Sequence, residues 1–153
     1  MIISGLITLH GFAAILWVGG LVFMYLVLRP SLQELAPESR VALMAGIFRR
    51  FFQLVWGSIA VLYVTGSGLI HSLYGTMAAT PLPVHFMIGV AHVMTGVFVY
   101  VWFRPYARFR RLVADGDVAD ALTAAYPVRR WATVNLALGL VASLLGAISP
   151  YAG

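Results

Sequence analysis

Residues 9–30 read LHGFAAILWVGGLVFMYLVLRP, an apolar run that begins beside His10 and ends at Arg29-Pro30. No Asp, Glu, Lys or Arg interrupts the run before Arg29. A helix needs about 20 apolar residues to cross the hydrocarbon core of a bilayer. Lipid offers no water to the backbone, so such a segment must satisfy its own hydrogen bonds as a helix. The stretch therefore predicts a transmembrane helix.

The composition of the whole chain agrees with this prediction. Of its 153 residues, 61% are hydrophobic and 10% are charged, and the mean hydropathy is +0.92. A soluble domain of this size could not bury so much apolar surface. Apolar runs long enough to span a bilayer cover residues 2–28, 51–73, 84–103 and 131–148. We predict an all-α polytopic membrane protein, one domain over residues 1–153, with four transmembrane helices in a bundle.

The basic residues predict the orientation of these helices. All ten are arginines, and all lie in or beside the first and third connections between spans. Because cytoplasmic loops carry the excess of Lys and Arg, we expect both connections in the cytoplasm and both termini on the periplasmic side of a bacterial inner membrane. The arginines do not gather on a soluble face, so we expect no nucleic-acid partner. The chain has no Cys, which excludes disulfides and thiolate metal sites.

The sequence also repeats itself at a constant spacing. A shift of 75 residues aligns His10 with His85 and Arg29-Pro30 with Arg104-Pro105, and a shift of 80 aligns Arg49-Arg50 with Arg129-Arg130. Spans one and three then run in the same direction. We predict two helical hairpins that form a parallel repeat about an axis along the membrane normal.

Four histidines are the candidate functional residues. At about 1.5 Å of rise per residue, His10, His71 and His85 share a layer near the outer edge of the hydrocarbon core, and His92 lies closer to the midplane. Ionisable residues inside a membrane are costly and often functional, and imidazole binds haem iron and copper. Our leading hypothesis is a haem b site with His10 and either His85 or His92 as axial ligands, and His71 as an outer partner or proton donor.

A bis-histidine haem would make the protein an electron carrier or oxidoreductase that exchanges electrons with a quinone or a periplasmic donor. Trp17 shares a helical stripe with His10, and Gly89 lies between His85 and His92, where it would leave room for a flat group. Helix packing is the alternative explanation for such small residues, and it would also permit a homodimer.

Two other functions fit the same residues. Thioethers suit Cu(I), so His71, Met77, Met87 and Met94 could serve with the other histidines in a protein that binds or transports copper. The remaining alternative is a structural membrane subunit without a cofactor, in which the histidines only form hydrogen bonds. An absorption spectrum would distinguish a haem protein from the other two possibilities. Copper content would then distinguish a copper protein from a structural subunit.

The stretch LHGFAAILWVGGLVFMYLVLRPSL resembles the first helix of the CopD-type membrane proteins, named for copper resistance, and VHFMIGVAHVMTGVFVYVWFRPY resembles them more weakly. The resemblance implies copper. The first stretch is also similar to the HemJ-type protoporphyrinogen oxidases, four-helix membrane proteins that bind haem, which implies His10 as a ligand and a haem-biosynthesis enzyme as a further alternative. That group uses a Lys early in its third helix, where this chain has His85 or Phe86.

Overall fold

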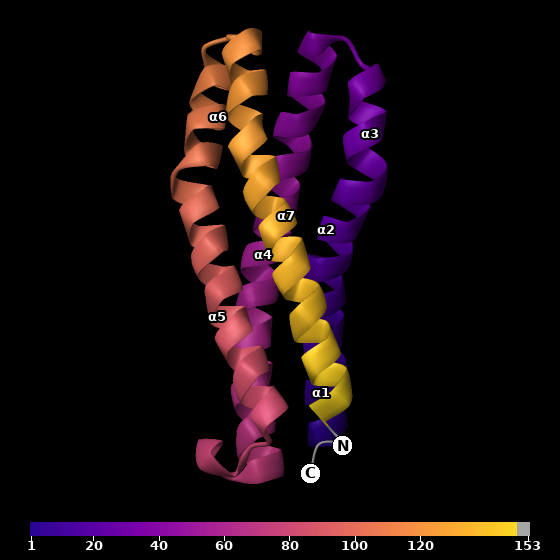
Figure 1. Cartoon of the computed structure of the whole chain (residues 1–153), viewed down its shortest axis with the longest axis vertical. Helices are drawn as coiled ribbons and strands as arrows, with labels where there is room; N and C mark the ends of the chain where they lie inside the picture. Colours follow the sequence, from indigo (N-terminus) through magenta and orange to yellow (C-terminus); the bar gives the residue numbers. More distant parts are fainter. Residues whose placement is uncertain (150–153) are drawn as a thin grey trace.

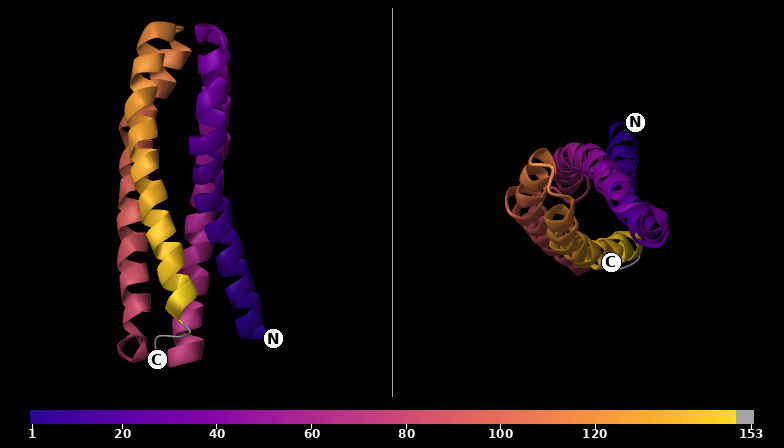
Figure 2. Two further views of the ribbon diagram at one scale, coloured as in Figure 1. Left: turned by 45° about the vertical axis from the view of Figure 1, so that its right-hand side comes forward. Right: turned by 90° about the horizontal axis from the view of Figure 1, so that it is seen from above.

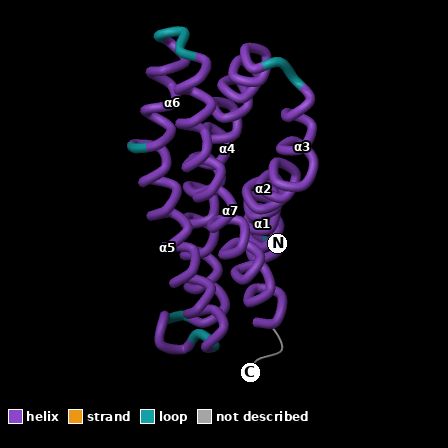
Figure 3. The backbone as a smooth tube through the Cα atoms, turned by 45° about the horizontal axis from the view of Figure 1, so that its top comes forward, coloured by secondary structure: helices purple, strands orange, loops and turns teal. Residues whose placement is uncertain are grey.

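The computed structural model describes residues 1–149, which form helices joined by short connections and include no strand (Figure 1). Four helical stretches are long and apolar enough to cross a membrane: Ile2–Glu34, Pro37–Tyr74, Leu82–Ala114 and Val118–Ile148. They lie lengthwise beside one another, with the loops at the two ends of the bundle (Figure 3). The prediction of an all-α protein with four membrane helices is confirmed.

The first long stretch is helical throughout but changes its winding. Helix α1 (Ile2–Ala14) is followed by a π-helical turn, η1 (Ile15–Gly19), and α2 (Gly20–Phe23) by a second one, η2 (Met24–Leu28). Short helices α3 (Arg29–Ser31) and η3 (Leu32–Glu34) complete it. The helix therefore continues past residue 28, where the predicted apolar span ends. Pro30 sits at the start of α3, a position where a missing N–H is tolerated.

The second long helix, α4 (Pro37–Tyr74), begins at Pro37, since a proline suits the first turn of a helix, and this start lies well before the apolar run at residue 51. Its first turns carry Arg40, Arg49 and Arg50, so hydropathy underestimates its length. The helix ends at Gly75, whose φ of 72° is left-handed; glycine adopts that conformation without the steric penalty of a side chain.

The third long stretch is divided in two. Helix α5 (Leu82–Phe103) matches the predicted span closely and follows a short 3₁₀ turn, η4 (Met77–Ala79). The chain bends at Arg104, which has φ −112° and ψ −87°, and continues as α6 (Pro105–Ala114). Pro105 ends one helix and starts the next, since its ring cannot continue α5 but suits a first turn.

The last helix, α7 (Val118–Ile148), begins after Gly116 and runs through Pro127. A proline usually marks a helix boundary, which predicts a short helix that ends before Pro127, but α7 continues through this residue. A proline inside a helix costs one hydrogen bond. Here that cost is offset by packing, because α7 lies along α6 in this region and buries Ala121, Ala124, Ala125 and Val128 around the proline.

The helices pack mainly as two hairpins. Helix α1 lies against α4, and α5 lies against α7 (Figure 2). Helix α7 also contacts α4 and α2, and these contacts join the hairpins. Buried aromatic rings concentrate in the arginine-rich half, where Phe52 meets Tyr106 at 4.6 Å and Phe48 meets Phe109 at 5.3 Å between ring centroids. Which side of the membrane each end faces stays a prediction.

Candidate functional site

His10 lies on α1 and is held by a threonine of α4. Its Nδ1 is 2.8 Å from Thr65 Oγ1, and the Thr65 hydroxyl donates its own proton to the carbonyl of Val61 at 2.6 Å. A hydroxyl that donates to Val61 can only accept from His10 Nδ1, and in that tautomer Nε2 would carry a free lone pair. Gly66 faces the same ring, and a Cβ there would be 3.4 Å from His10 Cε1. That tautomer would suit a metal ligand.

His92 is anchored on the other side of α4. Its Nδ1 donates to the carbonyl of Ile88 at 2.8 Å, and its ring stands edge-on to Tyr63 at 5.2 Å. Tyr63 and Thr65 are two residues apart on α4, so their side chains point about 200° apart around the helix. Because Thr65 holds His10, α4 stands between His10 and His92, and the structure does not bring this pair together.

The other two histidines lie at the end of the bundle that carries the connection between α4 and α5. His85, in the first turn of α5, has its Nδ1 3.0 Å from Thr80 Oγ1, and Thr80 itself donates to the carbonyl of Met77. His71 is exposed in the last turn of α4. Among residues 1–149, no three His, Cys, Asp or Glu side chains come close enough to hold a metal ion. The predicted outer layer of histidines is therefore not assembled into a closed site.

Two methionines lie in the interface between α5 and α7. The Met87 sulfur would be 3.3 Å from a Cβ placed on Gly146, and the Met94 methyl 3.2 Å from one placed on Gly139. Two thioethers seven residues apart on α5 therefore lie opposite two glycines seven apart on α7. Met77 is exposed in the second connection, between α4 and α5.

Trp17 and Gly89 do not surround a histidine cluster. Trp17 is buried in the core, edge-on to Phe98 at 6.2 Å between ring centroids. Gly89 is exposed, and a Cβ placed on it would find no atom within 4 Å. Their positions fit helix packing and a lipid-facing surface.

Asn135, which was not among the candidate site residues, forms a hydrogen bond between two helices. Its Nδ2 donates to the carbonyl of Met94 at 3.1 Å, across from α7 to α5. Its Oδ1 is buried and has no hydrogen-bond partner in the described part of the chain. A free acceptor therefore lies next to the Met94 backbone. The lone amide in an apolar span was the available signal, because a buried polar group needs a partner.

Comparison with protein families bears on the choice between copper and haem. The model of the copper resistance protein D family, CopD, matches residues 45–149. The chain belongs to the CopD family. The match starts after the first helix, whereas the stronger of the two resemblances described from the sequence lies within that helix.

Neither the search of curated proteins nor the search of solved structures gives a match. CopD membership supports copper, the alternative prediction, and gives no support to the haem b hypothesis. The resemblance to HemJ-type enzymes stays a prediction.

Proposed function

We propose that this CopD-family protein moves copper, as Cu(I), through the bacterial inner membrane, with its termini on the periplasmic side. The observation that carries the proposal is the pair of thioethers, Met87 and Met94, set opposite Gly146 and Gly139 between α5 and α7. Thioether sulfur is a soft ligand that suits Cu(I). Glycine on the facing helix leaves room for each methionine, since a Cβ there would lie 3.3 Å from the Met87 sulfur and 3.2 Å from the Met94 methyl group.

The arrangement of the ligands favours a transported ion over a resident one. His10 lies between α1 and α4, whereas the two methionines lie between α5 and α7. A tightly held metal needs its ligands in one shell. Ion passage needs several sites that are each weak enough to release the ion. Separate ligands at different places in the bundle meet the second requirement.

Each candidate ligand then has a proposed place along the path. Three of them lie in or beside the connection between α4 and α5, where they would receive the ion: His71, Met77 and His85. His10 offers a free Nε2 deeper in the bundle, and Met87 and Met94 offer sulfur along α5. The unpaired Oδ1 of Asn135 would add an oxygen ligand near Met94.

Copper uptake by proteoliposomes tests the proposal. The protein is reconstituted with a Cu(I)-sensitive fluorescent chelator inside, and Cu(I) is added outside. Met87→Leu and Met94→Leu keep the volume of the side chain but remove the sulfur. We expect each to slow uptake about tenfold, the effect of losing about 1.4 kcal/mol of binding.

Met44→Leu is the matched control, since Met44 is as buried as Met94 but lies on α4, outside the proposed path. It should transport copper at the wild-type rate. Equal rates for all three variants would overturn the proposal.

The absorption spectrum of the same purified protein, expressed with ample haem, checks the competing hypothesis. We expect no Soret band. A Soret band that sharpens on reduction and is lost in His10→Ala would favour a haem protein instead.

A further inference from the structure

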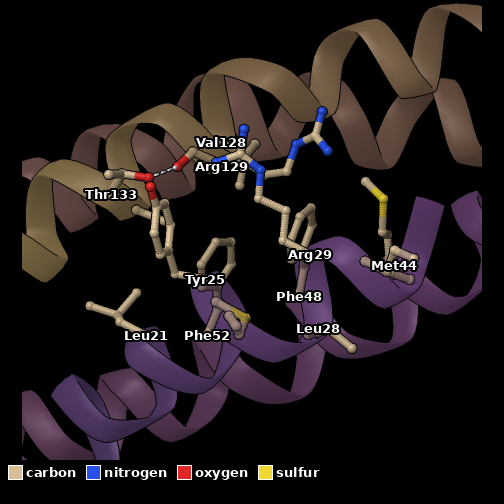
Figure 4. A pocket seen from close by; sticks show the side chains of 13 residues that line it. Leu21, Tyr25, Leu28, Arg29, Met44, Phe48, Phe52, Val128, Arg129 and Thr133 are labelled. Atoms are coloured by element: carbon tan, nitrogen blue, oxygen red, sulfur yellow. Dashed lines mark hydrogen bonds between the residues drawn. The ribbon is translucent and has the colours of Figure 1, made fainter.

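A groove that the copper proposal does not use lies at the arginine-rich end of the bundle. It is bounded by η2 and α3 on one side, α7 on the other and α4 beneath (Figure 4). Its wall is apolar and includes Leu28, Phe48, Phe52 and Val128, around a cavity of about 50 Å³. We call it the arginine groove, because Arg29 and Arg129 extend over it.

The two arginines come from different hairpins and carry like charge. Figure 4 shows Arg29 reaching from the first helix toward α7, beside Arg129. The positive charges of Arg29 and Arg40 both act on Arg129. Among residues 1–149, no Asp or Glu lines the groove. Like charges held together in a partly desolvated place repel each other, and the groove itself has no carboxylate to offset the two arginines.

The remaining polar groups define where the anion would sit. The Nη2 atom of Arg40 already donates to the carbonyls of Gln33 and Leu35 at 2.8 and 2.9 Å. Arg129 Nε is buried and has no hydrogen-bond partner within residues 1–149. Arg29 lies over the ring of Tyr25, 5.6 Å from its centroid. Donors of Arg29 and Arg129 are therefore left to face the groove.

We propose that the arginine groove binds one anionic phospholipid of the adjacent leaflet. Its phosphate would lie between Arg29 and Arg129, because the guanidinium fork matches phosphate oxygens. An acyl chain would lie on the wall of Leu28 and Phe52. A phospholipid would contact both the two arginines, through its phosphate, and the apolar wall, through its acyl chain. A free anion would contact only the arginines.

Such a lipid would bridge the two hairpins by joining Arg29 of the first to Arg129 of the second. A ligand that binds the folded state alone raises its stability. Lipid binding should therefore appear as a rise in the thermal unfolding midpoint. This inference concerns lipid and stands apart from copper transport.

The test titrates delipidated, full-length protein in a neutral detergent with four probes: phosphatidylglycerol, phosphatidylcholine with the same chains, glycerol phosphate and inorganic phosphate. Thermal unfolding and native mass spectrometry are the readouts. We expect phosphatidylglycerol to raise the midpoint most and to remain bound as one molecule per chain. A rise of equal size with phosphatidylcholine, or with either soluble phosphate, would overturn the proposal.

Three variants locate the site. Arg29→Gln and Arg129→Gln should each abolish most of the rise with phosphatidylglycerol. Arg130→Gln removes one positive charge from an exposed neighbouring position on α7. This variant should still show the full rise in midpoint with phosphatidylglycerol. Arg29 is itself exposed, so its variant folds even if the Arg129 variant does not. Equal responses in the Arg29 and Arg130 variants would mean that general surface charge, and not the groove, attracts the lipid.

Discussion

At the scale of single residues, a glycine marks a point where the two hairpins approach each other closely. A Cβ on Gly139 would lie 2.8 Å from Val18 Cγ2 and 3.2 Å from Met94 Cε. Val18 comes from η1 of the first helix and Met94 from α5, so three helices meet at this point. The β-branched Val18 has little freedom to move aside. The approach of α7 to both neighbours therefore depends on the missing side chain.

We expect Gly139→Ala to destabilise the protein by about 1–3 kcal/mol, because overpacking forces side chains or helices apart. The thermal unfolding midpoint in detergent measures this. Gly89→Ala is the control, since a Cβ there meets no atom within 4 Å; it should leave the midpoint unchanged or raise it. Equal losses in both variants would mean that α7 does not approach as closely as described.

The hydrogen bond between His10 and Thr65 gives a second residue-scale prediction. Thr65→Val keeps the shape of the side chain but removes the hydroxyl that accepts from His10. Interhelical hydrogen bonds in membranes contribute about 1 kcal/mol, so we expect a loss of this size in unfolding experiments. Thr133→Val is the control, because Thr133 Oγ1 donates only to the carbonyl of Arg129 in its own helix. An unchanged midpoint for Thr65→Val would show that the bond adds nothing to stability.

At the scale of elements, the start of α7 is set by one acidic side chain. Asp117 accepts from the backbone N–H of Asp120 at 3.0 Å, which satisfies one of the free donors of the first turn. Asp117→Ala should cost about 1 kcal/mol of stability. Asp115→Ala changes an exposed carboxylate of the same connection and should cost much less. Circular dichroism during thermal unfolding measures both.

The apolar runs predicted the existence of every membrane helix, because the bilayer demands length and hydropathy. Their ends were harder to predict. The extension of α4 toward Pro37 and the passage of α7 through Pro127 depend on tertiary packing, which leaves no hydropathy signal. The π turns η1 and η2 were not predicted either. A wider turn rotates the following side chains, so the stripes expected from a regular helix fail beyond Ile15.

The candidate site was predictable only as a list of residue types. His10 stood out because imidazole is costly in lipid, and Met87 and Met94 stood out because thioether sulfur suits Cu(I). Their grouping could not be predicted, since rise along a helix gives depth but not the face. His10 and His92 illustrate this, because the structure places them on opposite sides of α4.

At the scale of the whole molecule, the arginines predict which end faces the cytoplasm. The chain has no cysteine, so Gln33→Cys and Thr76→Cys each introduce a single thiol, in the first and second connections. A maleimide that cannot cross the inner membrane should label only Thr76→Cys in intact spheroplasts, and both after lysis. The reverse pattern would invert the topology.

The pairing of α1 with α4 and of α5 with α7 has a consequence for biosynthesis. The two helices of each pair leave the ribosome one directly after the other, so a nascent chain can complete its first pair before the second is translated. The last helix then docks beside an existing surface and need not separate helices that have already met. The order of translation is also the order in which the bundle can be assembled.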